Sequence, residues 1–235
     1  VLRRAKLLVL NYPNSPTGRV ATRDFYRRVV DFAREHHVVV VQDAAHIMLS
    51  YDGPPLSFLS LPGAKEVGVE VHSMSKGFHM IGWRLGWVCG HERIVRAFSD
   101  IKDNSDSGQF IAIQKAAAAA LDDAAIPGAV REKYRRRLQK LVTALSRCGF
   151  TCKMPGGTYF LYTPSPKGLA GGPRFDTAEA ASQYFITEHS ICTVPWDDAG
   201  AFLRFSVTYE APDEAAEDAL MTETEARLKQ LRLEF

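Results

Sequence analysis

The sequence has few cysteines, no long apolar run and almost no net charge. Its 235 residues include 29 Lys and Arg against 27 Asp and Glu, which gives a formal net charge of +2. So balanced a charge offers no electrostatic basis for binding nucleic acid or an acidic membrane surface. The longest apolar stretches are strand-sized, well short of the ~20 residues of a membrane helix. No signal-peptide pattern opens the chain. We therefore expect a cytoplasmic protein with neither nucleic-acid nor membrane partners.

The four cysteines, Cys89, Cys148, Cys152 and Cys192, are scattered along the chain. Cys148 and Cys152 could begin a metal site, but no second Cys/His pair has zinc-like spacing. The pattern predicts free thiols in a reducing compartment and no metal site.

The first residue is Val1 rather than methionine, and an apolar run begins as early as residue 7. We therefore expect the chain to be part of a larger protein. With 46% hydrophobic residues, it can bury one large core or two smaller ones.

In the first half, short apolar runs alternate with segments of helical periodicity. Strands are predicted at 7–10, 38–43, 68–72 and 85–90, and helices at 22–36, 94–102 and 111–121. This alternation favours an α/β sheet with helices on both faces, and the uniformly apolar run 7–10 predicts a strand buried on both sides. Asn14, Asp43 and Lys76 each follow a predicted strand, where ligands of such sheets gather.

The second half predicts an α+β pattern. Pro127 and Gly128 are expected to interrupt the chain before a basic helix at 129–148, whose cations should form a solvated face. Further strands are predicted at 149–152, 159–162, 191–194 and 202–208, helices at 177–189 and 212–233, and a loop at 168–173. We expect a large domain at 1–125 and a small one at 126–235 that includes the basic helix as a bridge.

Lys76 lies in a setting that suits a pyridoxal-phosphate Schiff base. Ser73 and Ser75 precede it and Arg84 follows, so an amine for the imine stands near hydroxyls and a guanidinium that can hold a phosphate. The alternative is an exposed lysine after a buried strand.

Asp43 is the candidate to keep the cofactor's ring nitrogen protonated, because a nearby carboxylate raises the pKa of that nitrogen. A helix N-cap aspartate is the alternative. Asn14, Ser15 and His46 are candidate donors to the ring's phenolate oxygen, although residues 14–18 could equally be a plain turn. Arg204, flanked by apolar strand residues, is the candidate clamp for a substrate α-carboxylate, with a structural ion pair as its alternative.

Taken in order, these residues resemble the signature of fold-type I aminotransferases of class I/II. The match consists of Asn14-Ser15-Pro16-Thr17-Gly18, Asp43, Ser73-x-Ser75-Lys76, Arg84 and Arg204. The resemblance implies an aspartate-aminotransferase-like three-layer large domain, here partial, and a smaller C-terminal α+β domain. It also implies pyridoxal 5'-phosphate as cofactor, amino-acid and 2-oxo-acid substrates, and a homodimer with shared active sites.

Within that class, residues 80–84, 102–110 and 190–196 resemble the LL-diaminopimelate aminotransferase branch. This implies amino transfer between LL-diaminopimelate/tetrahydrodipicolinate and glutamate/2-oxoglutarate, a step of lysine biosynthesis. Asn104, in the second stretch, is implied as a substrate-site residue near the neighbouring subunit. An aspartate, aromatic or alanine-type aminotransferase would share the same chemistry, and so would a non-catalytic regulatory domain of this type.

The sequence departs from the family pattern at two donors. Ser15 stands where asparagine is usual, and His46 where tyrosine is common, so the contact to the phenolate oxygen stays open among Asn14, Ser15 and His46. Family members also have a further N-terminal portion. We expect this chain to be a slice of a longer protein or inactive by itself.

Overall fold

The computed structural model describes residues 2–235, which divide into two compact units. The first comprises residues 2–15, 19–131 and 156–158; the second comprises residues 16–18, 132–155 and 159–235. Helix α6 (Ala125–Arg147) runs from the first unit into the second. No helix within residues 2–235 is long and apolar enough to cross a membrane.

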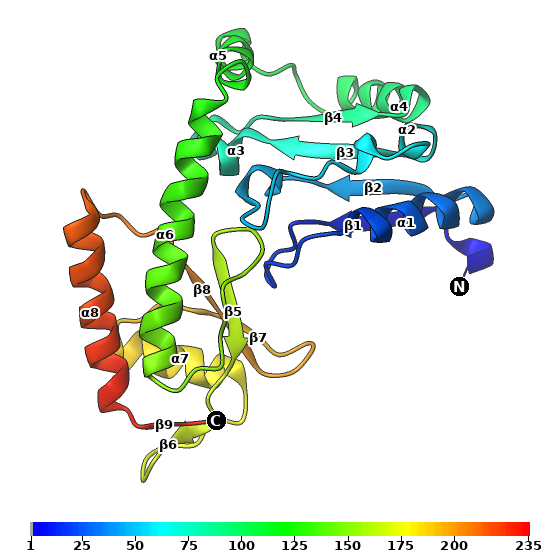
Figure 1. Ribbon diagram of the computed structural model, residues 1–235. Helices are drawn as coiled ribbons and strands as arrows, with labels where there is room; N and C mark the ends of the chain where they lie inside the picture. The colour runs from blue at the N-terminus through cyan, green and yellow to red at the C-terminus, as the bar shows by residue number, and fades with distance from the viewer. Residues whose placement is uncertain (1) are drawn as a thin grey trace. The chain divides into compact units, whose positions relative to one another are not determined.

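The first unit is built on a four-stranded sheet with the order β1-β2-β3-β4 (Figure 1). The strands are β1 (Leu7–Asn11), β2 (Val39–Asp43), β3 (Gly68–Ser73) and β4 (Gly86–Gly90). The first three are parallel and β4 is antiparallel to β3, and all four strands lie where the sequence predicted strands. The other elements of this part are η1 (Leu2–Arg4), α1 (Arg23–His36), η2 (Ile47–Leu49), η3 (Phe58–Ser60), α2 (Ala64–Val67), α3 (Met74–Gly77), η4 (Ile81–Trp83), α4 (Glu92–Asp103) and α5 (Ile111–Leu121).

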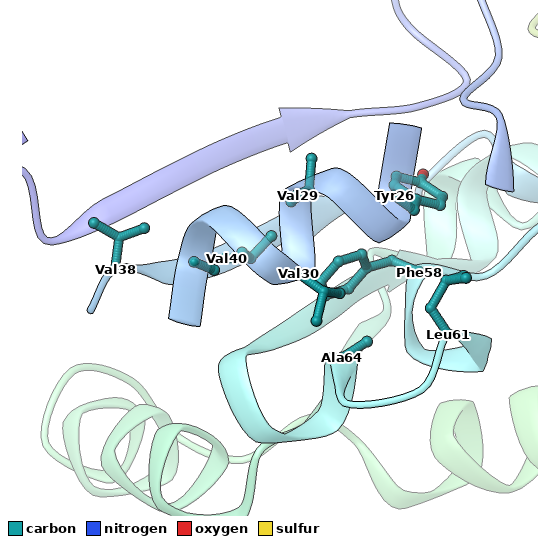
Figure 2. Close-up of a cluster of buried hydrophobic side chains, with 9 residues drawn as sticks. Tyr26, Val29, Val30, Val38, Val40, Phe58, Leu61 and Ala64 are labelled. Atoms are coloured by element: carbon teal, nitrogen blue, oxygen red, sulfur yellow. The ribbon is translucent and has the colours of Figure 1, made fainter. Parts of the chain in front are cut away.

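One face of this sheet packs against α1 and the segment around η3. Thr22 caps α1 by accepting a hydrogen bond from the Phe25 amide at 3.1 Å, and the helix then turns Val29 and Val30 toward the sheet. Figure 2 shows these side chains beside Val40 of β2 and Phe58, both fully buried. Burial of this apolar cluster fixes the sheet from one side.

The opposite face of the sheet is partly bare, so the prediction that β1 is buried on both sides is wrong. Leu7 and Val9 are 54% and 62% exposed, and Val71 of β3 is 39% exposed. Strand alternation puts all three on the face away from Val40, and nothing within residues 2–235 covers them.

The second unit contains a three-stranded antiparallel sheet, β5-β8-β7, and a two-stranded ribbon, β6-β9. Its elements, besides most of α6, are β5 (Phe160–Pro164), β6 (Gly168–Leu169), α7 (Ala178–His189), β7 (Val194–Trp196), β8 (Phe202–Ser206), α8 (Glu214–Gln230) and β9 (Leu233–Glu234). Three predictions were wrong here: residues 149–152 form no strand, residues 168–173 include β6, and β7 begins at Val194 rather than residue 191.

Helix α6 differs from its prediction in two ways. It begins at Ala125 and continues through Pro127, which the first turn tolerates because an amide there needs no intrahelical partner. Three of its cations do not lie on a solvated face: the side chains of Arg136, Arg137 and Lys140 are 31%, 2% and 19% exposed and surround Glu217 of α8. Tertiary ion pairing, invisible in the helical periodicity, decides their burial.

Candidate functional site

The candidate site of the first unit lies at the carboxyl ends of its parallel strands. Asn11 ends β1, Asp43 ends β2, and the register pairs Asn11 with Asp43 and Asp43 with Val71. Because side chains alternate along a strand, Asn11, Asp43 and Ser73 point to the same face of the sheet. The parallel topology thus gathers polar groups at the edge where ligands of α/β sheets bind.

Asp43 is held mainly through its backbone, which leaves part of its carboxylate available. Its carbonyl oxygen accepts hydrogen bonds from the Tyr12 amide at 3.2 Å, from Gln42 Nε2 at 3.1 Å and from Asn11 Nδ2 at 3.3 Å. Its Oδ1 accepts from the Ala45 amide at 3.0 Å within a turn. The helix N-cap alternative is wrong, because the next helix, η2, begins only at Ile47, with His46 at its N-cap. Oδ2 accepts no hydrogen bond from residues 2–235 and remains free to meet a cationic N–H.

Asn14 and Ser15 lie in a turn that is anchored on Asn11. The Ser15 amide donates to Asn11 Oδ1 at 2.8 Å, and Asn14 Nδ2 donates to the same oxygen at 3.3 Å. The Asn14 amide also bonds the Arg19 carbonyl at 2.7 Å. Sequence reasoning missed Asn11, although a carboxamide directly after an apolar strand run was a visible signal.

Lys76 is positioned by a single helical turn after β3. Ser73 caps α3 by accepting a hydrogen bond from the Ser75 amide at 3.1 Å. Met74 is fully buried, and Gly77 lies so close to Met48 that an added Cβ would stand 2.5 Å from the Met48 Cβ. The residues on either side of Lys76 are therefore fixed by packing, while Lys76 itself is partly exposed.

Arg84 occupies the left-handed region, with φ at 54°, directly after η4. A non-glycine residue in this conformation is strained by about 1 kcal/mol or more. Its Nη1 donates to the Ile81 carbonyl at 3.0 Å, and the side chain is otherwise exposed. The remaining guanidinium N–H groups are therefore accessible to an oxyanion.

Two other predicted site residues have different surroundings. His46 directly precedes η2, three residues after the end of β2. It is only 5% exposed, so its imidazole is buried. Asn104 is exposed at the end of α4, where its Nδ2 donates to the Asp100 carbonyl at 2.7 Å. Among residues 2–235, no hydrogen bond joins Asn104 to another predicted site residue.

Arg204 forms a separate candidate site within the second unit, in the middle of β8. Its guanidinium carbon lies 4.1 Å from the centre of the Phe160 ring and 5.7 Å from that of Trp196. Burial lowers the pKa of Arg204, with a smaller opposing effect from Tyr159.

Arg204 takes part in no ion pair within residues 2–235, which argues against the structural ion-pair alternative. Its Nε is buried without a hydrogen-bond partner. A buried cationic donor of this kind is costly unless an anion binds it. No group of three or more His, Cys, Asp or Glu residues in the described chain could hold a metal ion.

Comparison with known proteins identifies the family. The model of the family "Aminotransferase class I and II" matches residues 2–220. LL-diaminopimelate aminotransferase from Methanocaldococcus jannaschii is 54% identical over all of this chain, and its namesake from Methanococcus maripaludis is 50% identical. The apo structure of BacF from Bacillus subtilis superposes with a TM-score of 0.89 at 31% identity, covering 99% of this chain and 60% of BacF.

The chain spans 58% of the length of the two Methanocaldococcus and Methanococcus relatives. The family match nevertheless covers both units of the structure, from β1 into α8. The chain belongs to the class I and II aminotransferases, a family of pyridoxal-phosphate-dependent enzymes with the fold seen here.

Proposed function

We propose that this protein is a pyridoxal-phosphate-dependent aminotransferase in which Lys76 carries the cofactor. The supporting observation is the carboxyl edge of the first unit's sheet. Lys76 follows β3 there, while neighbouring β2 ends in Asp43 with one carboxylate oxygen free. Amine and carboxylate are the two groups that this cofactor requires at opposite ends of its ring system.

The remaining polar groups of the first unit also fit the cofactor. Ser73, Ser75 and the accessible part of Arg84 supply hydroxyls and a guanidinium, which match the oxygens of a phosphate. Asn14 and Ser15 supply donors for the ring oxygen, with buried His46 as a third candidate.

Each of these residues has a defined task in the proposed reaction. Pyridoxal phosphate, when bound, supplies an aldehyde that bonds amines and a ring that accepts the electron pair released at the substrate α-carbon. Asp43 would keep the ring nitrogen protonated, because its negative charge favours the cationic form. The Lys76 amine would hold the cofactor through its aldehyde and, when released, would act first as the base that takes the proton from the substrate α-carbon and then as the acid that returns it.

Arg204 would bind the α-carboxylate of the substrate. Its planar guanidinium can bond both carboxylate oxygens, and the aromatic rings of Phe160 and Trp196 limit its movement. An unpartnered, buried Nε supports this assignment, because a bound carboxylate would satisfy it.

For the complete protein we propose LL-diaminopimelate/tetrahydrodipicolinate and glutamate/2-oxoglutarate as substrates, which places it in lysine biosynthesis. The support is the name of the relatives that are 54% and 50% identical over the whole chain. We further propose a cytoplasmic homodimer with shared active sites, to which Asn104 contributes. Residues 1–125 would serve as part of the cofactor domain and 126–235 as the small domain.

Borohydride reduction tests the covalent assignment. The full-length protein is incubated with pyridoxal phosphate, reduced and digested, and the labelled peptide is mapped by mass spectrometry. We expect the label on Lys76, loss of it in Lys76→Ala, and retention in Lys65→Ala, which removes an exposed lysine of the same unit. A label on other lysines, or none, would contradict the proposal.

A substrate panel tests the specificity. Full-length protein should transfer the amino group of LL-diaminopimelate to 2-oxoglutarate faster than that of aspartate, alanine or an aromatic amino acid. Preference for one of the latter substrates would refute the diaminopimelate assignment but would leave the assignment as an aminotransferase intact. Cofactor binding without any turnover would instead favour a regulatory domain.

A further inference from the structure

The end of β1 holds a carboxamide that none of the proposed cofactor contacts uses. Asn11 is half-buried, is the last residue of β1, and faces Asp43 across the parallel register. We propose that Asn11 is a positioning residue, which sets the Asn14–Ser15 turn relative to Asp43 and so prepares both for pyridoxal phosphate. This inference rests on the proposed function.

The hydrogen bonds of Asn11 run in two directions at once. Its Nδ2 donates to the Asp43 carbonyl at 3.3 Å, while its Oδ1 accepts from the Ser15 amide at 2.8 Å and from Asn14 Nδ2 at 3.3 Å. A single planar group therefore ties the turn to the strand end. An aspartate could replace only the acceptor side, and an aliphatic residue neither side.

The Asp43 side of this link is fixed independently of Asn11. From the other face of the sheet, the fully buried Gln42 donates through Nε2 to the Tyr12 carbonyl at 2.7 Å and to the Asp43 carbonyl at 3.1 Å. The Tyr12 amide donates to the same Asp43 oxygen at 3.2 Å. Loss of Asn11 should therefore leave Asp43 in place and release chiefly the turn.

The consequence for the cofactor follows from preorganisation. Donors that are already oriented lose less conformational freedom when a ligand binds, so a rigid turn increases affinity. One ordinary hydrogen bond to the ring oxygen, if lost or misaligned, weakens binding by about tenfold. By contrast, a hydrogen bond that only caps a helix elsewhere in the first unit, such as that of Thr22, should contribute to stability without affecting cofactor affinity.

The test compares three variants of the full-length protein. Asn11→Ala removes both sides of the link, and Asn11→Asp keeps the acceptor for the Ser15 amide. Thr22→Ala is the matched control, because it removes one side-chain acceptor from a backbone amide, at the N-cap of α1 in the same unit. The measurements are hydrogen exchange of the Ser15 amide by NMR, thermal stability, and pyridoxal-phosphate affinity by absorbance titration.

We expect Asn11→Ala to accelerate exchange of the Ser15 amide and to weaken cofactor affinity by about tenfold. Asn11→Asp should keep the amide protected and restore part of the affinity, and Thr22→Ala should lower thermal stability with unchanged affinity. Wild-type affinity in Asn11→Ala, or an equal loss in Thr22→Ala, would overturn the inference while the proposed function stands. Failure of the unmodified full-length protein to take up cofactor at Lys76 would instead overturn the proposed function, and the inference with it.

Discussion

Glu217 of α8 provides a quantitative test of how the second unit is held together. Its carboxylate is 2% exposed and contacts three cations of α6: Arg136 at 3.0 Å, Arg137 at 2.6 Å and Lys140 at 3.3 Å. Arg137 is equally buried, donates to the Val207 and Tyr209 carbonyls, and lies over the Tyr209 ring at 4.4 Å. Replacing Glu217 with Gln keeps the shape of the side chain and removes its charge.

The magnitude follows from the pKa of Glu217. The hydrogen bond from Arg136, followed by those from Arg137 and Lys140, lowers this pKa from 4.5 to about 2 despite the opposing effect of burial. A difference of this size between folded and unfolded chain corresponds to on the order of 3 kcal/mol of stability. Because the folded pKa is depressed, the contribution is complete above about pH 4.5 and is lost as pH falls through about 2.

Glu217→Gln should therefore destabilise the second unit by about 3 kcal/mol at pH 7, since it leaves buried Arg137 without a counter-charge. It should also flatten the pH dependence of stability between about pH 4.5 and pH 2. The matched control is Glu214→Gln. Glu214 lies on α8 like Glu217, and its carboxylate is 3.1 Å from Arg136 of α6, but its side chain is 65% exposed. That control should change stability by less than about 1 kcal/mol.

The assay is urea unfolding at several pH values, monitored through hydrogen exchange of the α8 amides. These amides report on the stability of the second unit alone. The reasoning is refuted if Glu217→Gln and Glu214→Gln destabilise equally, or if Glu217→Gln keeps the wild-type pH dependence below pH 4.5.

Three further predictions concern other parts of the chain. Arg204→Lys should raise the substrate KM by about tenfold, because lysine keeps the charge but loses the stacked, bidentate guanidinium; unchanged KM would exclude Arg204 from the carboxylate site. Gly68→Ala should lower stability by about 1–3 kcal/mol, because its Cβ would lie 2.5 Å from a carbonyl oxygen of β2. Gly128→Ala, with open space in α6, should instead raise stability, and thermal unfolding distinguishes the two signs. Exposed Cys192 should react with a thiol reagent faster than Cys89, whose pKa is raised by burial and then by Glu70; equal rates would contradict this.

Much of the fold was predictable because its signals are local. The periodicity around Val29 and Val30, with Thr22 before it, predicted α1 correctly, and the valine-rich run ending at Asp43 predicted β2. The failures occurred where distant contacts decide the outcome. Residues 149–152 have strand-like composition but find no partner strand, and β6 exists only because β9, at the far end of the chain, pairs with it.

The candidate site likewise has features that the sequence predicts and features that only distant contacts reveal. The types of Lys76, Asp43 and Arg204 predicted a pyridoxal-phosphate site, because the cofactor and its substrate require an amine, an acid and a guanidinium. Their order resembled the aminotransferase signature. The position of Asn11 after an apolar run was visible in the sequence, but its proposed role was not, since a carboxamide at the end of a strand has no single function. That role became visible only from hydrogen bonds to Asp43 and Ser15, which are 32 and 4 residues away.

The sequence by itself determined the family of this protein and most of its helices and strands, because residue types and local periodicity can be read along the chain. Tertiary structure decided which charges are buried, which face of the sheet is exposed and which side chains hold the turn beside Asp43. Arg137 illustrates the reason: along the helix it resembles the exposed Arg135, and only the approach of Glu217 makes its burial favourable.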